Sequence, residues 1–271
     1  KLGYEQAVVY DRVLRFEERD KLMKILYYVY LLDVYMAVAN VAKERGFVFA
    51  KAHPNDKNML VMKGMFHPFL TKPVGNTIAV DENSNVIFLT GANMAGKSTF
   101  MKTFGITVFL AHVGFPVPAK EMEFSVQNGM FTTINLPDNL SMGYSHFYAE
   151  VLRVKKVAQQ VRQTQHLIVV FDELFRGTNV KDAFDATLAV TEAIAERKNC
   201  AFMVSTHIIE VGQELGKRCN NVTFEYLPTV MKGKLPTYTY KLEQGITSDK
   251  HGMIIINNEK IIETIKGEVA S

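Results

Sequence analysis

Residues 86–100 constrain this chain more than any other part of the sequence. Residues 91–98 fit the pattern Gly-x-x-x-x-Gly-Lys-Ser/Thr, and they follow an apolar run typical of a buried strand and precede a run compatible with a helix. Glycines at both ends let backbone N–H groups turn inward, and the helix that follows presents its positive N-terminal end to the same anion. The sequence therefore predicts a phosphate-binding loop between a strand and a helix.

Each position of this loop has an expected role in holding a nucleotide with Mg²⁺. Lys97 is expected to reach the β- and γ-phosphates, and Ser98 is expected to hold the metal ion. The residues expected to contact the nucleotide are Gly91, Ala92, Asn93, Met94, Ala95, Gly96, Lys97, Ser98 and Thr99.

Composition argues against a secreted or membrane-spanning protein. The 271 residues carry a formal net charge of only +3, so no global basic field indicates a nucleic-acid surface. The cysteines, Cys200 and Cys219, have neither metal-ligand spacing nor a disulfide framework. The most apolar window, residues 26–42, contains Asp33 and Asn40 and is shorter than the ~20 residues of a membrane span. We expect a cytoplasmic protein without membrane contact.

Two domains are predicted. Residues 4–45 contain neither glycine nor proline and are rich in helix-forming residues, so residues 1–48 are predicted to form a helical arm of one long helix or two, ending near Gly46. Residues 49–271 are predicted to form the nucleotide-binding domain. Because the chain begins at Lys1 without an initiator methionine, we expect it to be a piece of a longer protein.

The second domain has the pattern of an α/β fold with a mostly parallel sheet. Continuous apolar runs at residues 167–171 and 201–205 alternate with helical patterns. In such sheets, ligands bind at the carboxyl ends of the strands, where the phosphate loop, Asp172-Glu173 and His207 all fall. Nearer the C-terminus, residues 222–226 and 238–242 are expected to be antiparallel strands joined by a loop.

Acidic and basic side chains at these strand ends suit nucleotide hydrolysis. Asp172 is expected to orient Mg²⁺ or its water shell, and Glu173 to polarise the attacking water. His207 is expected to hydrogen-bond the γ-phosphate or that water. This P-loop NTPase is expected to take a nucleoside triphosphate and Mg²⁺.

Three motifs together resemble the ATPase domain of the MutS family of DNA mismatch repair proteins. They are TGANMAGKST (residues 90–99), FDELFRGT (residues 171–178) and STH (residues 205–207). Supporting pieces are His67-Pro68, GFPVPA (residues 114–119) and DNLSMGYSHFYAE (residues 138–150), and residues 31–34 resemble the end of the family's lever helices. The family's usual residues are replaced at Ala92, Ala95 and Phe175, which indicates a divergent branch.

The resemblance implies an ABC-type ATPase core whose domains pair head to tail in a dimer. It implies that Ser145 reaches the γ-phosphate of the partner in trans, although a plain helix N-cap is an alternative role for this residue. It also implies that Asn93 contacts phosphate in cis, and that Asn179 and Asp182 lie at the dimer interface.

The function expected from these patterns is Mg²⁺-dependent ATP binding and hydrolysis that drives dimer closure in a MutS-like DNA repair or DNA-structure-binding protein. Glu173, His207, Lys97 and Ser145 (in trans) are the expected catalytic residues, and Ser98 and Asp172 the metal ligands. The expected partners are ATP, a second copy of the chain, and DNA contacted through parts outside this chain. The alternative is a nucleotide-gated scaffold with little intrinsic hydrolysis and a partner other than mismatched DNA.

Overall fold

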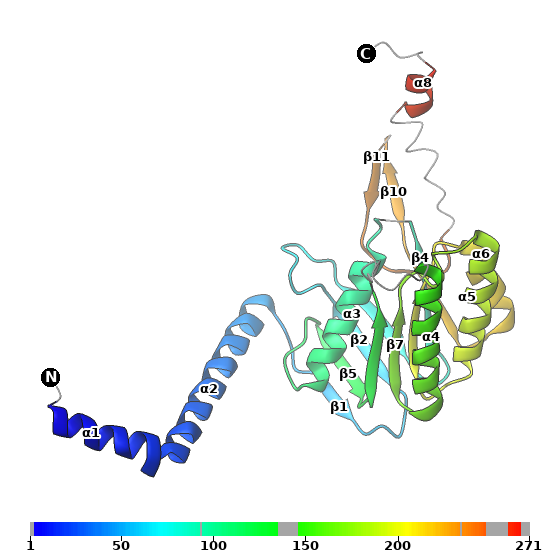
Figure 1. Ribbon diagram of the computed structural model, residues 1–271. Helices are drawn as coiled ribbons and strands as arrows, with labels where there is room; N and C mark the ends of the chain where they lie inside the picture. The colour runs from blue at the N-terminus through cyan, green and yellow to red at the C-terminus, as the bar shows by residue number, and fades with distance from the viewer. Residues whose placement is uncertain (1–2, 93, 135–145, 234, 248–259, 267–271) are drawn as a thin grey trace. The chain divides into compact units, whose positions relative to one another are not determined.

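The computed structural model describes residues 3–92, 94–134, 146–233, 235–247 and 260–266. The chain divides into two compact units, Lys1–Phe47 and Val48–Ser271 (Figure 1). We describe each unit by itself.

The first unit is helical and has no buried residue in its helices. The region predicted as one long helix or two forms α1 (Tyr4–Arg12), a short π-helix η1 (Val13–Glu17) and α2 (Arg19–Arg45). Gly46 ends α2 in the left-handed conformation, at φ 69°, as its glycine predicted. Within the described residues, α2 is long and apolar enough to cross a membrane by length and composition alone. Helices that pack against other parts of a protein can have the same length and composition. The absence of membrane contact therefore stays a prediction.

The second unit is built on a six-stranded sheet, in which five strands are parallel and the edge strand β12 is antiparallel. In spatial order the strands are β12 (Glu243–Gln244), β9 (Val222–Leu227), β4 (Val86–Gly91), β8 (Ala201–Ser205), β7 (Leu167–Phe171) and β6 (Gly129–Thr133). The mixed α/β class and the parallel sheet expected from the sequence are confirmed.

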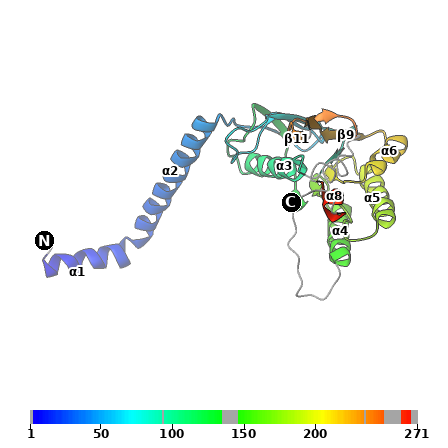
Figure 2. The ribbon, with the colours of Figure 1, turned by 90° about the horizontal axis from the view of Figure 1, so that it is seen from above.

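A second sheet and the helices cover this central sheet. The four-stranded sheet contains, in order, β1 (Lys51–His53), β5 (Glu121–Ser125), β2 (Leu60–Met65) and β3 (Asn76–Val80). The longer helices are α3 (Lys97–His112), α4 (His146–Gln163), α5 (Val180–Ala195) and α6 (Ile209–Arg218). Figures 1 and 2 show α4, α5 and α6 grouped on one side of this unit and α3 on the other. The remaining elements are the hairpin of β10 (Thr229–Lys232) with β11 (Leu235–Tyr238), and α8 (Ile261–Ile265).

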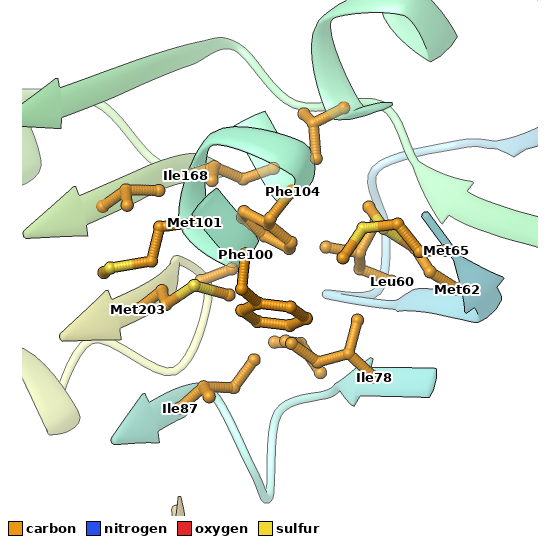
Figure 3. Close-up of a cluster of buried hydrophobic side chains, with 14 of the residues drawn as sticks. Leu60, Met62, Met65, Ile78, Ile87, Phe100, Met101, Phe104, Ile168 and Met203 are labelled. Atoms are coloured by element: carbon orange, nitrogen blue, oxygen red, sulfur yellow. The ribbon is translucent and has the colours of Figure 1, made fainter. Parts of the chain in front are cut away.

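The central sheet separates two hydrophobic clusters. Alternate residues of a strand point to opposite faces, so Ile87 packs toward α3 and the smaller sheet, whereas Phe88 packs toward α4, α5 and α6. Figure 3 shows the first cluster, in which Phe100 and Phe104 of α3 lie against Met62 of the smaller sheet. Because both faces of the sheet are covered, its inner strands are apolar on both faces, which is why they appeared as continuous apolar runs.

The expected pairing of residues 222–226 with 238–242 is wrong. The antiparallel partner of β9 is β12, just beyond the expected segment, and on its other side β9 pairs in parallel with β4 over six residues. The segment predicted as a loop forms its own hairpin, β10 with β11. Gly233, at φ 63°, allows the tight turn of this hairpin. The sheet thereby gains a parallel strand whose carboxyl end lies beside that of β4.

Helix α6 was not predicted, because Gly212 and Gly216 weaken the helical signal of its sequence. The structure shows why glycine stands at position 212. A Cβ there would come within 3.2 Å of Phe88 Cε1, so the helix lies directly on the sheet. This close packing stabilises α6 in the folded protein, an effect that the helix propensity of its residues does not predict.

Candidate functional site

Residues 91–98, hereafter the glycine loop, join the carboxyl end of β4 to the N-terminus of α3. Gly91 and Gly96 have φ values of 141° and 102°, in the region that favours glycine. A Cβ on Gly91 would also come within 3.1 Å of the Leu227 carbonyl oxygen at the end of β9. Both glycines are therefore required by the backbone path, which brings the loop back over the strand ends.

Lys97 begins α3, yet its side chain is only 4% exposed. Its Nζ donates to the carbonyl oxygens of Gly91 at 2.7 Å and Ala92 at 3.3 Å, and lies 3.9 Å from Glu173 Oε1. Burial lowers the pKa of Lys97, and the charges of Glu173 and Asp172 oppose that shift. A cation is thus held inside the loop, facing the acidic end of β7.

A serine on the neighbouring strand links the two acidic residues that follow β7. Ser205 Oγ donates to Asp172 Oδ1 at 2.7 Å and accepts a hydrogen bond from the Glu173 backbone N–H at 2.9 Å. β8 lies between β4 and β7, so Ser205 sits between the glycine loop and the Asp-Glu pair. The carboxyl ends of three adjacent strands therefore converge on one polar site.

The backbone after Asp172 takes an uncommon path. Glu173 and Phe175 have φ values of 52° and 61°, which are strained for residues with a Cβ. Glu150 of α4 accepts a hydrogen bond at Oε1 from the Phe175 N–H at 2.5 Å. Burial raises the pKa of Glu150, and this hydrogen bond partly opposes the shift. Contacts from β8 and α4 hold the strained turn from two sides.

The oxygen donors at this site fit Mg²⁺. Asp172 offers a carboxylate, and Ser98, half-buried in the first turn of α3, offers a hydroxyl. Mg²⁺ keeps several waters and is commonly bound by one or two carboxylates together with substrate phosphates. Among the described residues there is no cluster of three or more His, Cys, Asp or Glu side chains that could hold a metal. The donor set suits an ion held jointly with phosphate.

A pocket of about 440 Å³ opens beside the glycine loop, within the range of roughly 300–1,000 Å³ for small-molecule sites. It is mainly apolar, and part of its wall is the loop itself. Its lining residues are Met65, Phe66, His67, Leu70, Thr71, Lys72, Val74, Asn76, Met94, Ala95, Gly96, Thr99, Phe100, Thr103, Leu227 and Tyr240.

Tyr240 contributes a half-exposed aromatic ring to this pocket, and a buried asparagine fixes its backbone. A Cβ on Gly96 would come within 3.1 Å of Tyr240 Cδ1, so the ring lies directly beside the glycine loop. Asn76 Nδ2 donates to the Tyr240 carbonyl oxygen at 3.0 Å, and its Oδ1 accepts from the Leu242 N–H at 2.8 Å. This pair of bonds joins the start of β3 to a segment far along the chain.

His67 supplies an uncharged polar group to the same pocket. Its Nδ1 accepts a hydrogen bond from the Phe69 N–H at 3.3 Å. Burial, and to a smaller extent the charge of Lys102, lowers the pKa of His67 below its ordinary value of 6.5. The imidazole is therefore neutral at pH 7, and its ring packs at 6.0 Å from that of Phe69.

The other predicted residues lie at different places. His207 is exposed and lies two residues after the end of β8, the strand between those that carry the loop and the Asp-Glu pair. Asn179 caps α5 by accepting from the Asp182 N–H at 2.9 Å, so these two residues, predicted at a dimer interface, pair with each other within the chain. Asn93 and Ser145 lie outside the described residues.

Sequence reasoning assigned no role to three residues that the structure brings to the site. Ser205 ends an otherwise apolar strand, which was the available signal for it. Glu150 is the last residue of the motif at residues 138–150, but the sequence predicted no contact for its side chain. The sequence around Tyr240 held no signal for such a role, because this residue is far from the glycine loop in sequence and is brought to it by tertiary packing.

Comparison with known proteins places the site region in a described family. A family model described as MutS domain V matches residues 87–268. The DNA mismatch repair protein MutS of Persephonella marina is 28% identical over 269 residues, which cover 96% of this chain and 30% of that protein. MutS of Petrotoga mobilis is also 28% identical, over 94% of this chain and 32% of its own length. The chain thus spans about three tenths of the length of these relatives.

Proposed function

The chain belongs to the MutS family, and from this membership we propose that its second unit is a P-loop ATPase with an ABC-type core that binds and hydrolyses ATP with Mg²⁺. The observation that carries the proposal is the convergence of Lys97, Asp172 and Glu173 at adjacent strand ends. Lys97 Nζ and Glu173 Oε1 lie 3.9 Å apart there. A buried cation beside two carboxylates is the arrangement that phosphate binding and water activation require.

The glycine loop and Lys97 bind the phosphates. The Lys97 ammonium donates hydrogen bonds to the carbonyl oxygens of Gly91 and Ala92. Phosphate oxygens carry full negative charge and replace these weaker acceptors. The N-terminus of α3 adds its backbone N–H groups and its dipole. Because Lys97 is buried, its attraction to phosphate is screened little by solvent.

Ser98 and Asp172 hold Mg²⁺, which, when bound, neutralises phosphate charge. The hydrogen bond from Ser205 to Asp172 Oδ1 would hold this carboxylate in one orientation while it binds the ion. Glu173 accepts a proton from a water that attacks the γ-phosphorus, and the bond from that phosphorus to the β-phosphate oxygen breaks, which releases ADP and phosphate. Lys97 stabilises the charge of the transferred group, and His207 hydrogen-bonds the water or the phosphate.

The apolar pocket beside the loop takes the nucleobase. Its wall includes Gly96 and Thr99 of the phosphate-binding segment, so a nucleotide whose phosphates lie in the loop has its base within reach of the pocket. Tyr240 offers the base an aromatic face. His67 is neutral, so binding of an uncharged base does not have to remove water from a charged imidazole.

Replacing Tyr240 with alanine is expected to weaken ATP binding about tenfold, because stacking of a base on an aromatic side chain contributes about 1–3 kcal/mol. Binding of inorganic tripolyphosphate, which has no base, is expected to stay within about twofold of wild type. Tyr240→Phe is the matched control and should bind ATP normally. Calorimetric titration measures both ligands. An equal loss of both would mean that Tyr240 acts on the glycine loop instead of on a base.

We further propose that two copies of the chain pair head to tail, with Ser145 of one copy completing the ATP site of the other, and that ATP drives this closure. Asn93 contacts phosphate within its own chain, and Asn179 and Asp182 contribute to the interface. The names of the relatives support a role in DNA mismatch repair, with DNA contacted through parts outside this chain. The protein acts in the cytoplasm.

The rate of ATP hydrolysis against protein concentration tests the shared site. Activity per chain is expected to rise with concentration. Ser145→Ala and Lys97→Ala are each expected to be inactive alone, and mixing them should restore part of the activity, because one site of the mixed dimer then has both Lys97 and Ser145. No recovery, together with a wild-type rate independent of concentration, would show that each chain works alone.

A further inference from the structure

We propose that Ser205 is a positioning residue that aligns Asp172 for Mg²⁺ and Glu173 for water, a role that rests on the proposed ATPase function. Ser205 is the last residue of β8, and its side chain is fully buried, with 0% exposed. β8 pairs with β7 up to the residue before Asp172, so the serine stands beside the point where the acidic pair begins.

The Ser205 hydroxyl has a single proton, and the structure assigns it to a carboxylate. Ser205 Oγ donates to Asp172 Oδ1 at 2.7 Å, and the same oxygen accepts from the Glu173 N–H at 2.9 Å. A hydrogen bond to an ionised acceptor is about twice as strong as one between neutral groups, and a hydroxyl that donates and accepts is polarised by both partners. One buried side chain thus contacts both acidic residues.

For Asp172, this bond restricts rotation of the carboxylate. Oδ1 accepts the hydrogen bond from Ser205, so the carboxylate would be held in one orientation toward a bound Mg²⁺. Mg²⁺ demands a near-ideal ligand geometry, so a carboxylate held in one orientation binds it better than one that rotates freely.

For Glu173, the contact holds a strained backbone. Its φ of 52° is unfavourable for a residue with a Cβ, and persists only where the surroundings impose it. The bond from the Glu173 N–H to Ser205 Oγ supplies that restraint. The backbone conformation in turn directs the carboxylate toward Lys97. Alanine at position 205 would leave the buried N–H and Asp172 Oδ1 without this partner.

Titration of nucleotide binding with Mg²⁺ tests the role directly on the full chain. A fluorescent ATP analogue is bound with and without EDTA, and the Mg²⁺ concentration that half-saturates the gain in affinity is measured. In Ser205→Ala, affinity without Mg²⁺ should stay within about twofold of wild type, because the Ser205 hydroxyl is hydrogen-bonded to Asp172 and Glu173, not to the described residues of the glycine loop. The half-saturating Mg²⁺ concentration should rise about tenfold, the scale of one hydrogen bond to a charged group.

A matched control is Thr107→Val, which removes another fully buried hydroxyl. Thr107 Oγ donates to the Thr103 carbonyl oxygen within α3 and contacts neither acidic residue. This variant should leave the Mg²⁺ requirement unchanged, so a general loss of stability is separated from a positioning effect. In the Asp172→Ala background, Ser205→Ala should cause no further change in the half-saturating Mg²⁺ concentration, because the carboxylate that it orients is gone.

Turnover supplies the second readout. With bound nucleotide used to count active sites, Ser205→Ala should lower kcat about tenfold with KM for ATP unchanged. If the alanine variant does not fold, Ser205→Cys, which keeps a small side chain but donates only weakly, takes its place and should show the same changes.

The outcomes separate two failures. A folded Ser205 variant with normal Mg²⁺ titration and normal kcat overturns the positioning role alone. A shift of equal size in the Mg²⁺ titration in the Asp172→Ala background also overturns it, because Ser205 would then act on Mg²⁺ binding without Asp172. Wild-type protein that neither binds nucleotide in a Mg²⁺-dependent way nor turns ATP over removes the proposed function, and the positioning role with it.

Discussion

Glu173→Gln is expected to lower the rate of ATP hydrolysis by at least ~10²-fold, the scale of a general-base contribution, while ATP binding is retained. Glutamine keeps the size of the side chain but cannot accept a proton from the attacking water. The carboxylate of Glu173 lies 3.9 Å from Lys97 Nζ and is mostly shielded from solvent, with 18% of its side chain exposed. Removing its charge also removes a repulsion toward the ATP phosphates, so binding should be unchanged or tighter.

Single-turnover hydrolysis and equilibrium ATP binding together check this prediction. Glu214→Gln is the matched control, since Glu214 lies on α6 in ion pairs with Lys217 and Arg218. The control should hydrolyse ATP at the wild-type rate. Wild-type turnover in Glu173→Gln would show that another group activates the water, and that Glu173 serves to balance the charges of Lys97 and Arg176, which both pair with it.

Lys97→Ala is expected to abolish measurable ATP binding. Truncating one member of a buried charge pair costs about 2–5 kcal/mol, which corresponds to at least ~30-fold in Kd. Lys97 is buried, and its ammonium also satisfies the carbonyl oxygens of Gly91 and Ala92. The variant therefore loses the charge that attracts phosphate and leaves the loop without its internal contact.

Calorimetric titration with ATP measures the loss, and thermal unfolding verifies that the variant is folded. Lys217→Ala is the matched control, because it also removes one positive charge but from an exposed lysine. This variant should bind ATP normally. If folded Lys97→Ala bound ATP within a few-fold of wild type, the glycine loop would not be the phosphate site, and the proposed function would need another location.

Much of the candidate site could be predicted because its signals are local. The spacing of Gly91, Gly96 and Lys97 is contained in eight residues between a strand and a helix. Asp172 directly follows one apolar run, and His207 lies shortly after the next. In a parallel sheet, carboxyl ends lie at one edge, so these separate segments could be placed together without knowing which strands are neighbours.

The order of the strands could not be predicted in the same way. The sequence pattern predicts residues 238–242 as the antiparallel partner of β9, but that partner is β12, and on its other side β9 lies in parallel beside β4. Helix α6 was not predicted because Gly212 is a poor helix former. Its lack of a side chain matters only in the folded protein, where Phe88 packs against it. Both errors concern contacts between residues far apart in the chain.

By itself, the sequence determined the α/β class, the strand-to-helix glycine loop and the chemical groups at its strand ends, because each depends on a short pattern of residues. Only the tertiary structure decided what those groups contact. Ser205 reaches Asp172 and Glu173 from a neighbouring strand, and Asn76 holds the segment that brings Tyr240 against Gly96. Side-chain hydrogen bonds act over about 3 Å, so residues far apart in sequence acquire such roles only when packing brings them within that distance.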